Sequence, residues 1–203
     1  MTYSPEKHHR RSIRLPGYDY SRNGAYFITI CTQSRECRFG EIVNEVMQLN
    51  DAGRIVADAW AWLGQQYDHV VMDEWVVMPN HLHGIIVIVD DCRGGSETKC
   101  TGGSETKCTG GSRTAPTEPR KPLGRLIGAY KTVSTKRINE KHQTPGEQLW
   151  QRNYHERIIR NANELHRIRQ YIIDNPAQWD RDSDNPHTLH KPAKIRNFEE
   201  LGV

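Results

Sequence analysis

The sequence predicts an α+β fold in which a ferredoxin-like antiparallel sheet carries helices on one face. Four short runs are rich in β-branched and aromatic residues, and three other segments have apolar residues at helical spacing. The predicted order is strand, helix, strand, strand, helix, strand and helix, which is the split βαβ arrangement. The open face of such a sheet is a natural platform for a functional site.

The first half of the chain contains three predicted strands and one predicted helix. Residues 25–32 are rich in β-branched and aromatic side chains, as expected of a strand. Asn50 is a suitable cap for a helix whose apolar residues recur at helical spacing. These apolar residues are Ile55, Val56, Ala59, Trp60 and Leu63. Residues 70–78 and 81–89 are two further predicted strands, separated by a Pro-Asn pair that breaks the run.

The second half contains two predicted helices and one predicted strand. The first helix is amphipathic. Its apolar positions are Leu123, Leu126, Ile127, Tyr130, Val133 and Ile138. Residues 150–160 hold the predicted fourth strand. Asn161 and Glu164 have the spacing of a capping box, so we expect a last helix that starts there and ends before Pro176.

A low-complexity insert separates the two halves. The eight residues 94–101 are repeated identically at 102–109. Such a repeat is too short and too polar to be a packed unit, so it is interpreted as a flexible linker. The predicted organisation is a basic N-terminal tail at 1–15, one domain at 16–180 that the linker at 92–118 interrupts, and a C-terminal tail at 181–203.

Composition narrows the class of protein further. The 203 residues include no apolar run of the roughly 18 residues that a transmembrane helix needs, and the N-terminus lacks the apolar stretch of a secretory signal. We therefore expect no membrane partner and a cytoplasmic, nucleoid-associated protein. The five cysteines include no CxxC pair and are interpreted as free thiols in a reducing compartment.

The net charge of +3 is modest, but the basic residues are clustered. One cluster lies on the polar side of the first helix after the linker, and the other lies near the N-terminus. Basic stripes of this kind suit a phosphate backbone, although a solvated helix face is the alternative. The candidate DNA-binding residues are Arg125, Lys131, Lys136, Arg137, Arg10, Arg11 and Arg14.

Two histidines one residue apart open the third predicted strand. Side chains alternate along a strand, so His81 and His83 point to the same face, while Leu82 between them anchors the strand in the core. Two imidazoles on one face are able to bind one metal ion. The pattern alone also fits a chance pair on a solvated face.

A tyrosine and an asparagine on the last helix supply the second half of a candidate site. Tyr171 and Asn175 are four residues apart, so they share a helix face. A tyrosine nucleophile needs a polarised target phosphate, and a metal held by the histidines would polarise it. Asn175 would complete the ligand set. Tyr130 and Tyr154 are rival nucleophiles, the first of them expected in the core, and a purely structural Tyr171 remains an alternative.

These motifs together resemble a known family. The run from Trp75 to His83 resembles the histidine–hydrophobic–histidine motif of HUH endonucleases, in the form found in IS200-like single-tyrosine transposases. The rest is similar to the REP-associated branch of those transposases over about residues 16–179, except the linker. The matching residues downstream are Trp150, Gln151, Tyr154, Ile159 and Arg160, followed by Tyr171, Ile172, Asn175 and Pro176.

The resemblance implies a metal-dependent DNA strand transferase of HUH endonuclease type. Tyr171 would attack single-stranded DNA and form a 5′-phosphotyrosine, with Mg²⁺ or Mn²⁺ held by His81, His83 and Asn175. The expected partner is single-stranded or hairpin DNA, and a monomer is favoured over a dimer. Two alternatives stay open: a nucleic-acid-binding module that has lost cleavage, and a metal-dependent phosphoesterase of small substrates.

Overall fold

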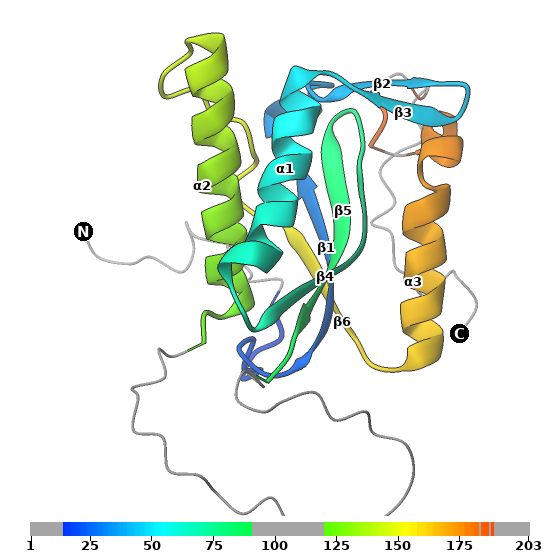
Figure 1. Cartoon of the computed structure of the whole chain (residues 1–203). Coiled ribbons are helices and arrows are strands. Elements are labelled where there is room, and N and C mark those ends of the chain that lie inside the picture. Colours follow the sequence, from blue (N-terminus) through cyan, green and yellow to red (C-terminus); the bar gives the residue numbers. More distant parts are fainter. Residues whose placement is uncertain (1–13, 91–119, 183, 187, 189–203) are drawn as a thin grey trace, which may run out of the picture.

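A four-stranded antiparallel sheet forms the centre of the computed structural model, which describes residues 14–90, 120–182, 184–186 and 188 (Figure 1). The strand order is β4-β5-β1-β6. The bounds of these strands are Gly24–Cys31 for β1, Val70–Val77 for β4, His81–Ile88 for β5 and His155–Ile159 for β6. The predicted linker and most of the predicted N-terminal tail lie outside the described residues.

Three helices cover the sheet, and they lie on both of its faces. They are α1 (Asp51–Gln66), α2 (Leu123–His142) and α3 (Ala162–Asp174), followed by the short 3₁₀ helix η2 (Pro176–Arg181). Figure 1 shows α1 and α2 side by side on one face and α3 across the sheet from them. None of the described helices combines the length and apolar character needed to cross a bilayer.

The predicted fold class is confirmed, with one difference in the layers. The expectation that the helices share one face holds for α1 and α2 but not for α3. The reason is that β1 is apolar on both faces: Tyr26 and Ile28 face the core under α1 and α2, whereas Phe27 packs with Ile168 and Ile172 of α3. A second apolar cluster therefore exists, and only a helix on that side covers it.

Both predicted helix caps are present. The side chain of Asn50 accepts a hydrogen bond from the amide of Gly53 at 2.9 Å, and the side chain of Asn161 accepts one from the amide of Glu164 at 2.8 Å. The carboxylate of Glu164 accepts from the backbone amide of Arg160 at 2.8 Å, one residue before the position that a capping box uses. These local bonds set where α1 and α3 begin.

A small hairpin that sequence reasoning missed closes one end of the sheet. It consists of β2 (Gly40–Val43) and β3 (Val46–Leu49), and it follows the short 3₁₀ helix η1 (Gln33–Arg35). The two turn residues have positive φ angles of 49° and 63°, as the tight turns of hairpins require. Strand β3 contacts both α1 and η2, so the hairpin spans the end of the sheet from one helical layer to the other.

Candidate active site

The two histidines lie side by side on the face of the sheet that α3 covers. In the register of β5 with β1, His81 lies opposite Cys31 and His83 lies opposite Thr29. The centroids of the two imidazole rings are 4.5 Å apart, and the residues are 0% and 3% exposed. Leu82 points the other way and belongs to the core under α1 and α2, as predicted. The pair is therefore buried between sheet and helix.

Each of the two imidazole rings forms a hydrogen bond through its own Nδ1 atom. Nδ1 of His81 lies 2.8 Å from the side-chain oxygen of Asn80, and Nδ1 of His83 lies 2.8 Å from the hydroxyl of Thr29. Metal-binding histidines generally use one ring nitrogen for the metal and tie the other to a neighbouring polar group. Because both Nδ1 atoms are engaged, each ring would bind a metal through Nε2.

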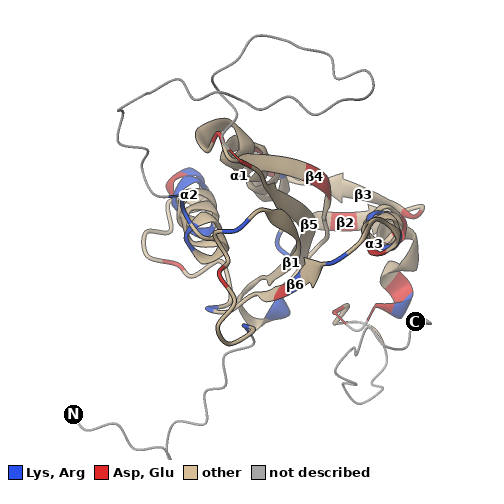
Figure 2. Ribbon diagram, turned by 90° about the horizontal axis from the view of Figure 1, so that it is seen from below, with Lys and Arg blue, Asp and Glu red and all other residues tan. Residues whose placement is uncertain are grey.

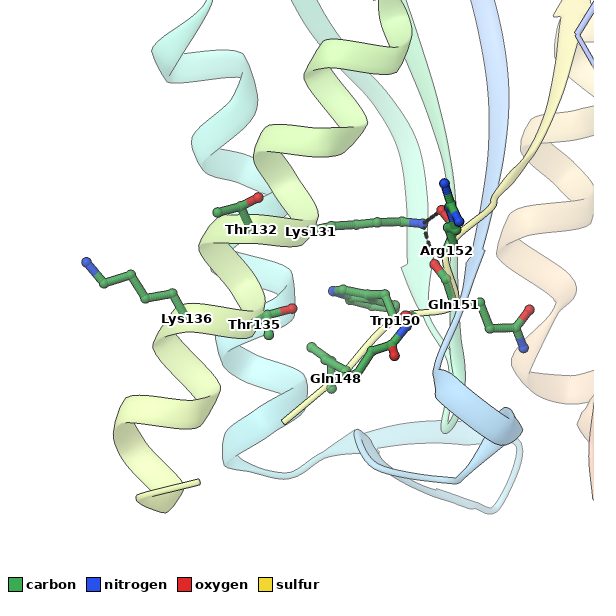
Figure 3. A pocket seen from close by; sticks show the side chains of 9 residues that line it. Lys131, Thr132, Thr135, Lys136, Gln148, Trp150, Gln151 and Arg152 are labelled. Atoms are coloured by element: carbon green, nitrogen blue, oxygen red, sulfur yellow. Dashed lines mark hydrogen bonds between the residues drawn. The ribbon is translucent and has the colours of Figure 1, made fainter. Parts of the chain in front are cut away.

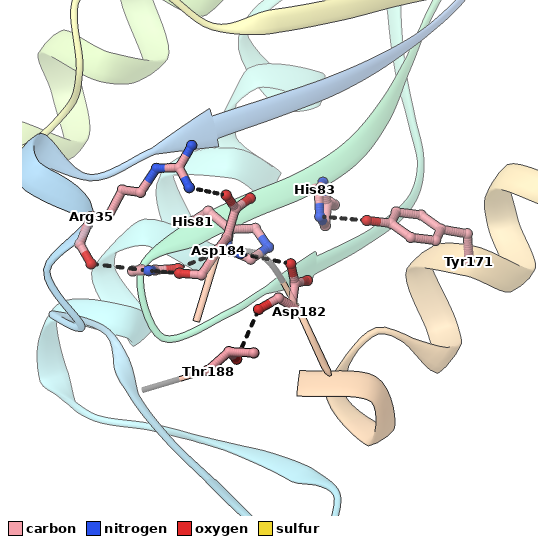
Figure 4. A network of polar contacts seen from close by, with 8 residues as sticks. Arg35, His81, His83, Tyr171, Asp182, Asp184 and Thr188 are labelled. Atoms are coloured by element: carbon pink, nitrogen blue, oxygen red, sulfur yellow. Dashed lines mark hydrogen bonds and ion pairs between the residues drawn. The ribbon is translucent and has the colours of Figure 1, made fainter. Parts of the chain in front are cut away.

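The candidate nucleophile meets this pair. The phenolic oxygen of Tyr171 on α3 lies 3.3 Å from Nε2 of His83 (Figure 4). Phe27 contacts both rings: it stacks on His83 at a centroid distance of 5.4 Å and meets Tyr171 edge-on at 6.0 Å. The buried phenylalanine thus fixes the spacing between the strand that carries the imidazoles and the helix that carries the phenol.

Asn175 lies at the end of α3, between two residues that reach the histidines. Tyr171 precedes it by one turn, and Trp179 in η2 follows it, with its ring 6.0 Å from that of His81. Asn175 is 2% exposed, and its side-chain oxygen is buried without a hydrogen-bond partner among the described residues. A buried acceptor with no partner is costly, so this carbonyl oxygen fits the ligand of a cation.

The candidate donor set differs from the usual clusters of charged metal ligands. Within the described residues, no cluster of three or more His, Cys, Asp or Glu side chains is placed to bind a metal. The candidate set instead has two imidazoles and one amide oxygen, from His81, His83 and Asn175. Imidazole and amide ligands are compatible with Mg²⁺ and Mn²⁺, and substrate oxygens and water usually complete their coordination.

Two ionic contacts anchor the helix that carries Tyr171. Arg169 donates two hydrogen bonds to Asp73, at 2.9 Å and 2.6 Å, and Asp73 lies where the pairing register of β4 with β5 shifts. Burial raises the pKa of Asp73, but the bonds from Arg169 and from the Glu74 amide outweigh it, so the net pKa is lowered. At the start of the helix, Glu164 accepts a bond from Arg157 at 2.7 Å.

The beginning of the predicted C-terminal tail packs against the histidine strand. Asp184 forms a 2.7 Å ion pair with Arg35, and its backbone carbonyl accepts a 2.6 Å bond from the side-chain amide of Asn80 (Figure 4). Asp182, two residues earlier, is 3% exposed. Sequence reasoning placed these residues in a tail because no local pattern distinguishes an acidic turn that docks from one that is solvated.

The predicted DNA-binding residues fall into different environments. Arg125, Lys136 and Arg137 are exposed on α2, and Figure 2 shows several Lys and Arg positions, coloured blue, along the ribbon of this helix. Arg14 donates to the hydroxyl of Tyr154 at 2.7 Å and lies 3.6 Å from a carboxylate oxygen of the buried Glu156. Arg10 and Arg11 lie outside the described residues. Of the described members, Arg125, Lys131, Lys136 and Arg137 belong to α2, which covers the opposite face of the sheet from α3.

Lys131 differs from the other basic residues of α2. Its ammonium donates to the backbone carbonyls of Gln151 at 2.8 Å, Arg152 at 3.4 Å and Asn153 at 2.9 Å (Figure 3). Burial lowers the pKa of this ammonium to about 8. Its contacts hold the segment between α2 and β6, where the same side chain also borders a pocket of about 410 Å³. The pocket is lined by Lys131, Thr132, Thr135, Lys136, Gln148, Leu149, Trp150, Gln151 and Arg152.

The two rival tyrosines lie elsewhere. Tyr130 is fully buried against Trp60 and Trp150, as predicted for a core residue. Tyr154 contacts Arg14 on the far side of the sheet from α3. Of the three candidates, Tyr171 is the one that contacts a histidine of the pair.

The chain is similar to known proteins both in sequence and in structure. No family model matches the chain. An uncharacterised protein of Haemophilus influenzae is 38% identical over 182 residues, which are 89% of this chain and 95% of that protein. Among solved structures, a REP-associated tyrosine transposase bound to a REP hairpin is similar with a TM-score of 0.52 and 16% identity, over 83% of this chain and 74% of that one. A candidate transposase of Deinococcus radiodurans has a TM-score of 0.41 and 18% identity, over 81% of this chain and 98% of that one.

Proposed function

We propose a function from two premises: the chain belongs to the same family as the Haemophilus influenzae protein, and it has the fold of a REP-associated tyrosine transposase. In this proposal, the protein is a transposase-type enzyme that cleaves and rejoins single-stranded DNA, and its target is a hairpin element. The similar solved structure holds a REP hairpin, which supports this class of substrate.

One observation carries the proposal: a phenol and two imidazoles from two distant segments meet, and a buried amide oxygen, that of Asn175, lies one helical turn from the phenol. Tyr171 lies 3.3 Å from His83, and the imidazole rings of His81 and His83 are 4.5 Å apart. The hydroxyl of Tyr171 borders an apolar cluster and meets an imidazole of the pair. This contact would place the phenol within reach of an ion bound by the histidines, as a metal-assisted nucleophile requires.

The proposed reaction exchanges one phosphodiester bond for another. The phenolic oxygen of Tyr171 forms a bond to the phosphorus, and the bond from that phosphorus to the 3′ oxygen breaks. The phenol loses a proton and the 3′ oxygen gains one, so the step consumes no net proton. The product is a 5′-phosphotyrosine and a free 3′-hydroxyl. Because the number of phosphodiester bonds is unchanged, the reverse reaction rejoins DNA without a nucleotide cofactor.

Mg²⁺ or Mn²⁺ bound at this site would polarise the scissile phosphate and stabilise its developing charge. His81 and His83 would bind the ion through Nε2, since both Nδ1 atoms face other partners, and Asn175 would bind it through its orphaned oxygen.

The exposed cations of α2 supply a surface for the DNA backbone. Arg125, Lys136 and Arg137 lie along this helix, and Arg14 lies near its N-terminal end, where its guanidinium closely approaches Gly124. Such contacts hold phosphates without reading sequence, so they would position a hairpin whose unpaired flank reaches Tyr171.

A covalent-capture experiment tests the proposal. The protein is incubated with Mn²⁺ and hairpin DNA from its own genomic flanks, labelled at either the 5′ or the 3′ end. The proposed chemistry links Tyr171 to the downstream fragment, so the 3′ label migrates with the protein in a denaturing gel and the 5′ label appears as a shorter free strand. The reverse distribution of labels, or hydrolysis without an adduct, would contradict the mechanism. Binding without cleavage would favour the binding-module alternative.

A further inference from the structure

We infer that Asn80 is a positioning residue that holds His81 in the tautomer able to bind a metal. The inference rests on the proposed function, because it concerns how the proposed metal site is prepared. Asn80 is 1% exposed and belongs to the turn between β4 and β5. Its side chain forms hydrogen bonds with Arg35, Asp184 and His81, and it would act on the metal through His81.

The orientation of the Asn80 amide follows from its partners. The NH₂ group donates to the backbone carbonyl of Arg35 at 3.0 Å and to that of Asp184 at 2.6 Å. Carbonyl oxygens only accept hydrogen bonds, so the flipped amide would place three acceptors against one another. The amide oxygen must therefore face His81, whose Nδ1 lies 2.8 Å away.

This orientation decides which nitrogen of His81 carries the proton. The amide oxygen is an acceptor, so Nδ1 of His81 must be the donor. In the neutral imidazole the lone pair then lies on Nε2, in a ring that lies 6.0 Å from the ring of Trp179 in η2. The opposite tautomer would carry a hydrogen on Nε2 and would be unable to bind a cation there.

The amide of Asn80 and its two carbonyl partners come from three segments that are distant in sequence. Arg35 follows β1, and Asp184 follows η2, while Asn80 lies between β4 and β5. A 2.7 Å ion pair joins Arg35 to Asp184, so the two carbonyls that orient the amide are themselves cross-linked (Figure 4). The tautomer of His81 is thus set by the tertiary fold before any ion binds.

Manganese titration of variants tests this role. Asn80→Ala removes the acceptor for Nδ1, and we expect Mn²⁺ affinity to fall by about 10–100-fold, as for comparable groups behind metal-binding histidines. Asn80→Asp keeps an acceptor and loses both donors, so it should retain most of the affinity while melting at a lower temperature without metal. The matched control is Asn139→Ala, which loses one 2.9 Å bond to the carbonyl of Glu147 far from the site.

The outcomes separate this role from simple stabilisation. Asn139→Ala should lower the melting temperature and leave Mn²⁺ affinity unchanged. If Asn80→Ala behaves in the same way as this control, the inference is overturned. If the native protein binds Mn²⁺ and Asn80→Ala binds it equally well, the proposed metal site stands and only the role of Asn80 falls. If the native protein binds no Mn²⁺, the proposed site and this inference fall together.

The tautomer of His81 is also measurable in the native protein, so this second test does not depend on whether a variant folds. A long-range ¹H–¹⁵N spectrum of the metal-free protein distinguishes the two neutral tautomers of a histidine. We expect His81 to carry its proton on Nδ1. A spectrum that shows the proton on Nε2 would overturn the inference, whatever the variants do.

Discussion

The phenolic oxygen of Tyr171 lies 3.3 Å from Nε2 of His83, although 88 residues separate them in the chain. The contact joins the middle of the sheet to a helix that packs on the face opposite α1 and α2. A tyrosine held against an imidazole in a buried setting is poised for proton transfer or for sharing an ion with it. The proposed chemistry depends on this contact more than on any other.

The first prediction concerns the nucleophile. Tyr171→Phe removes one oxygen and barely changes side-chain volume, so folding and DNA binding should be retained while the covalent adduct falls to background. Tyr130→Phe is the matched control, because the hydroxyl of Tyr130 is buried without a hydrogen-bond partner in the described structure. Its loss should leave adduct formation and stability unchanged or slightly improved. Adduct formation at the native rate by Tyr171→Phe would rule out this assignment.

The second prediction concerns the shared ion. If His81 and His83 bind one metal, either change to Ala should abolish most of the cleavage, and the double change should add little to the loss. Initial rates of cleavage at saturating Mn²⁺ measure this. If the rate loss of the double variant equals the product of the two single losses, the histidines act separately. Full cleavage in EDTA would likewise contradict a shared metal ion.

The strands, the helix caps and the histidine pair were predictable because each depends on neighbours in the chain. Asn50 and Asn161 cap helices through bonds to residues three positions ahead, and this spacing is visible in the sequence. The two-residue period of a strand placed His81 and His83 on one face. No local pattern encodes the meeting of Tyr171 with His83. It was expected from the chemical need of a tyrosine nucleophile for a polarised phosphate and from the resemblance to single-tyrosine transposases.

The features that were missed depend on contacts between distant segments. The position of α3 follows from Phe27, which gives β1 a second apolar face. The docking of Asp184 near Asn80 and the contacts of Lys131 with three backbone carbonyls are likewise non-local. A basic stripe in the sequence looks the same whether its lysines hold the protein's own carbonyls or remain exposed.

The third prediction concerns pH and the anchoring of α3. The pKa of Asp73 is lowered in the folded protein, so its contribution to stability is present above the unfolded value of about 4 and is lost as the pH falls through the folded value. Asp73→Asn should therefore melt at a lower temperature than the native protein at pH 7, and the difference should shrink below pH 4. A difference that stays constant across this range would show that Arg169 does not act through the charge of Asp73.

The fourth prediction concerns the eight-residue repeat, which lies outside the described residues. A linker contributes little to the core, and the entropy of loop closure grows slowly, by about 0.6 kcal/mol for each doubling of length. Deleting residues 102–109 should leave the melting temperature and the rate of adduct formation almost unchanged. A loss of several kcal/mol in the free energy of unfolding would mean that the repeat packs or binds.

The last prediction separates two lysines of the same helix. Lys136 is exposed, so if it contacts a phosphate, Lys136→Gln should weaken binding to all DNA sequences alike and reduce the salt slope of log K by about 0.7 for a single strand or 0.9 for a duplex stem. Lys131→Met should instead lower the free energy of unfolding by about 1.5–3 kcal/mol, because three backbone carbonyls lose a charged donor. Its salt slope should match that of the native protein. A reduced slope in Lys131→Met with unchanged stability would instead make Lys131 a direct phosphate contact.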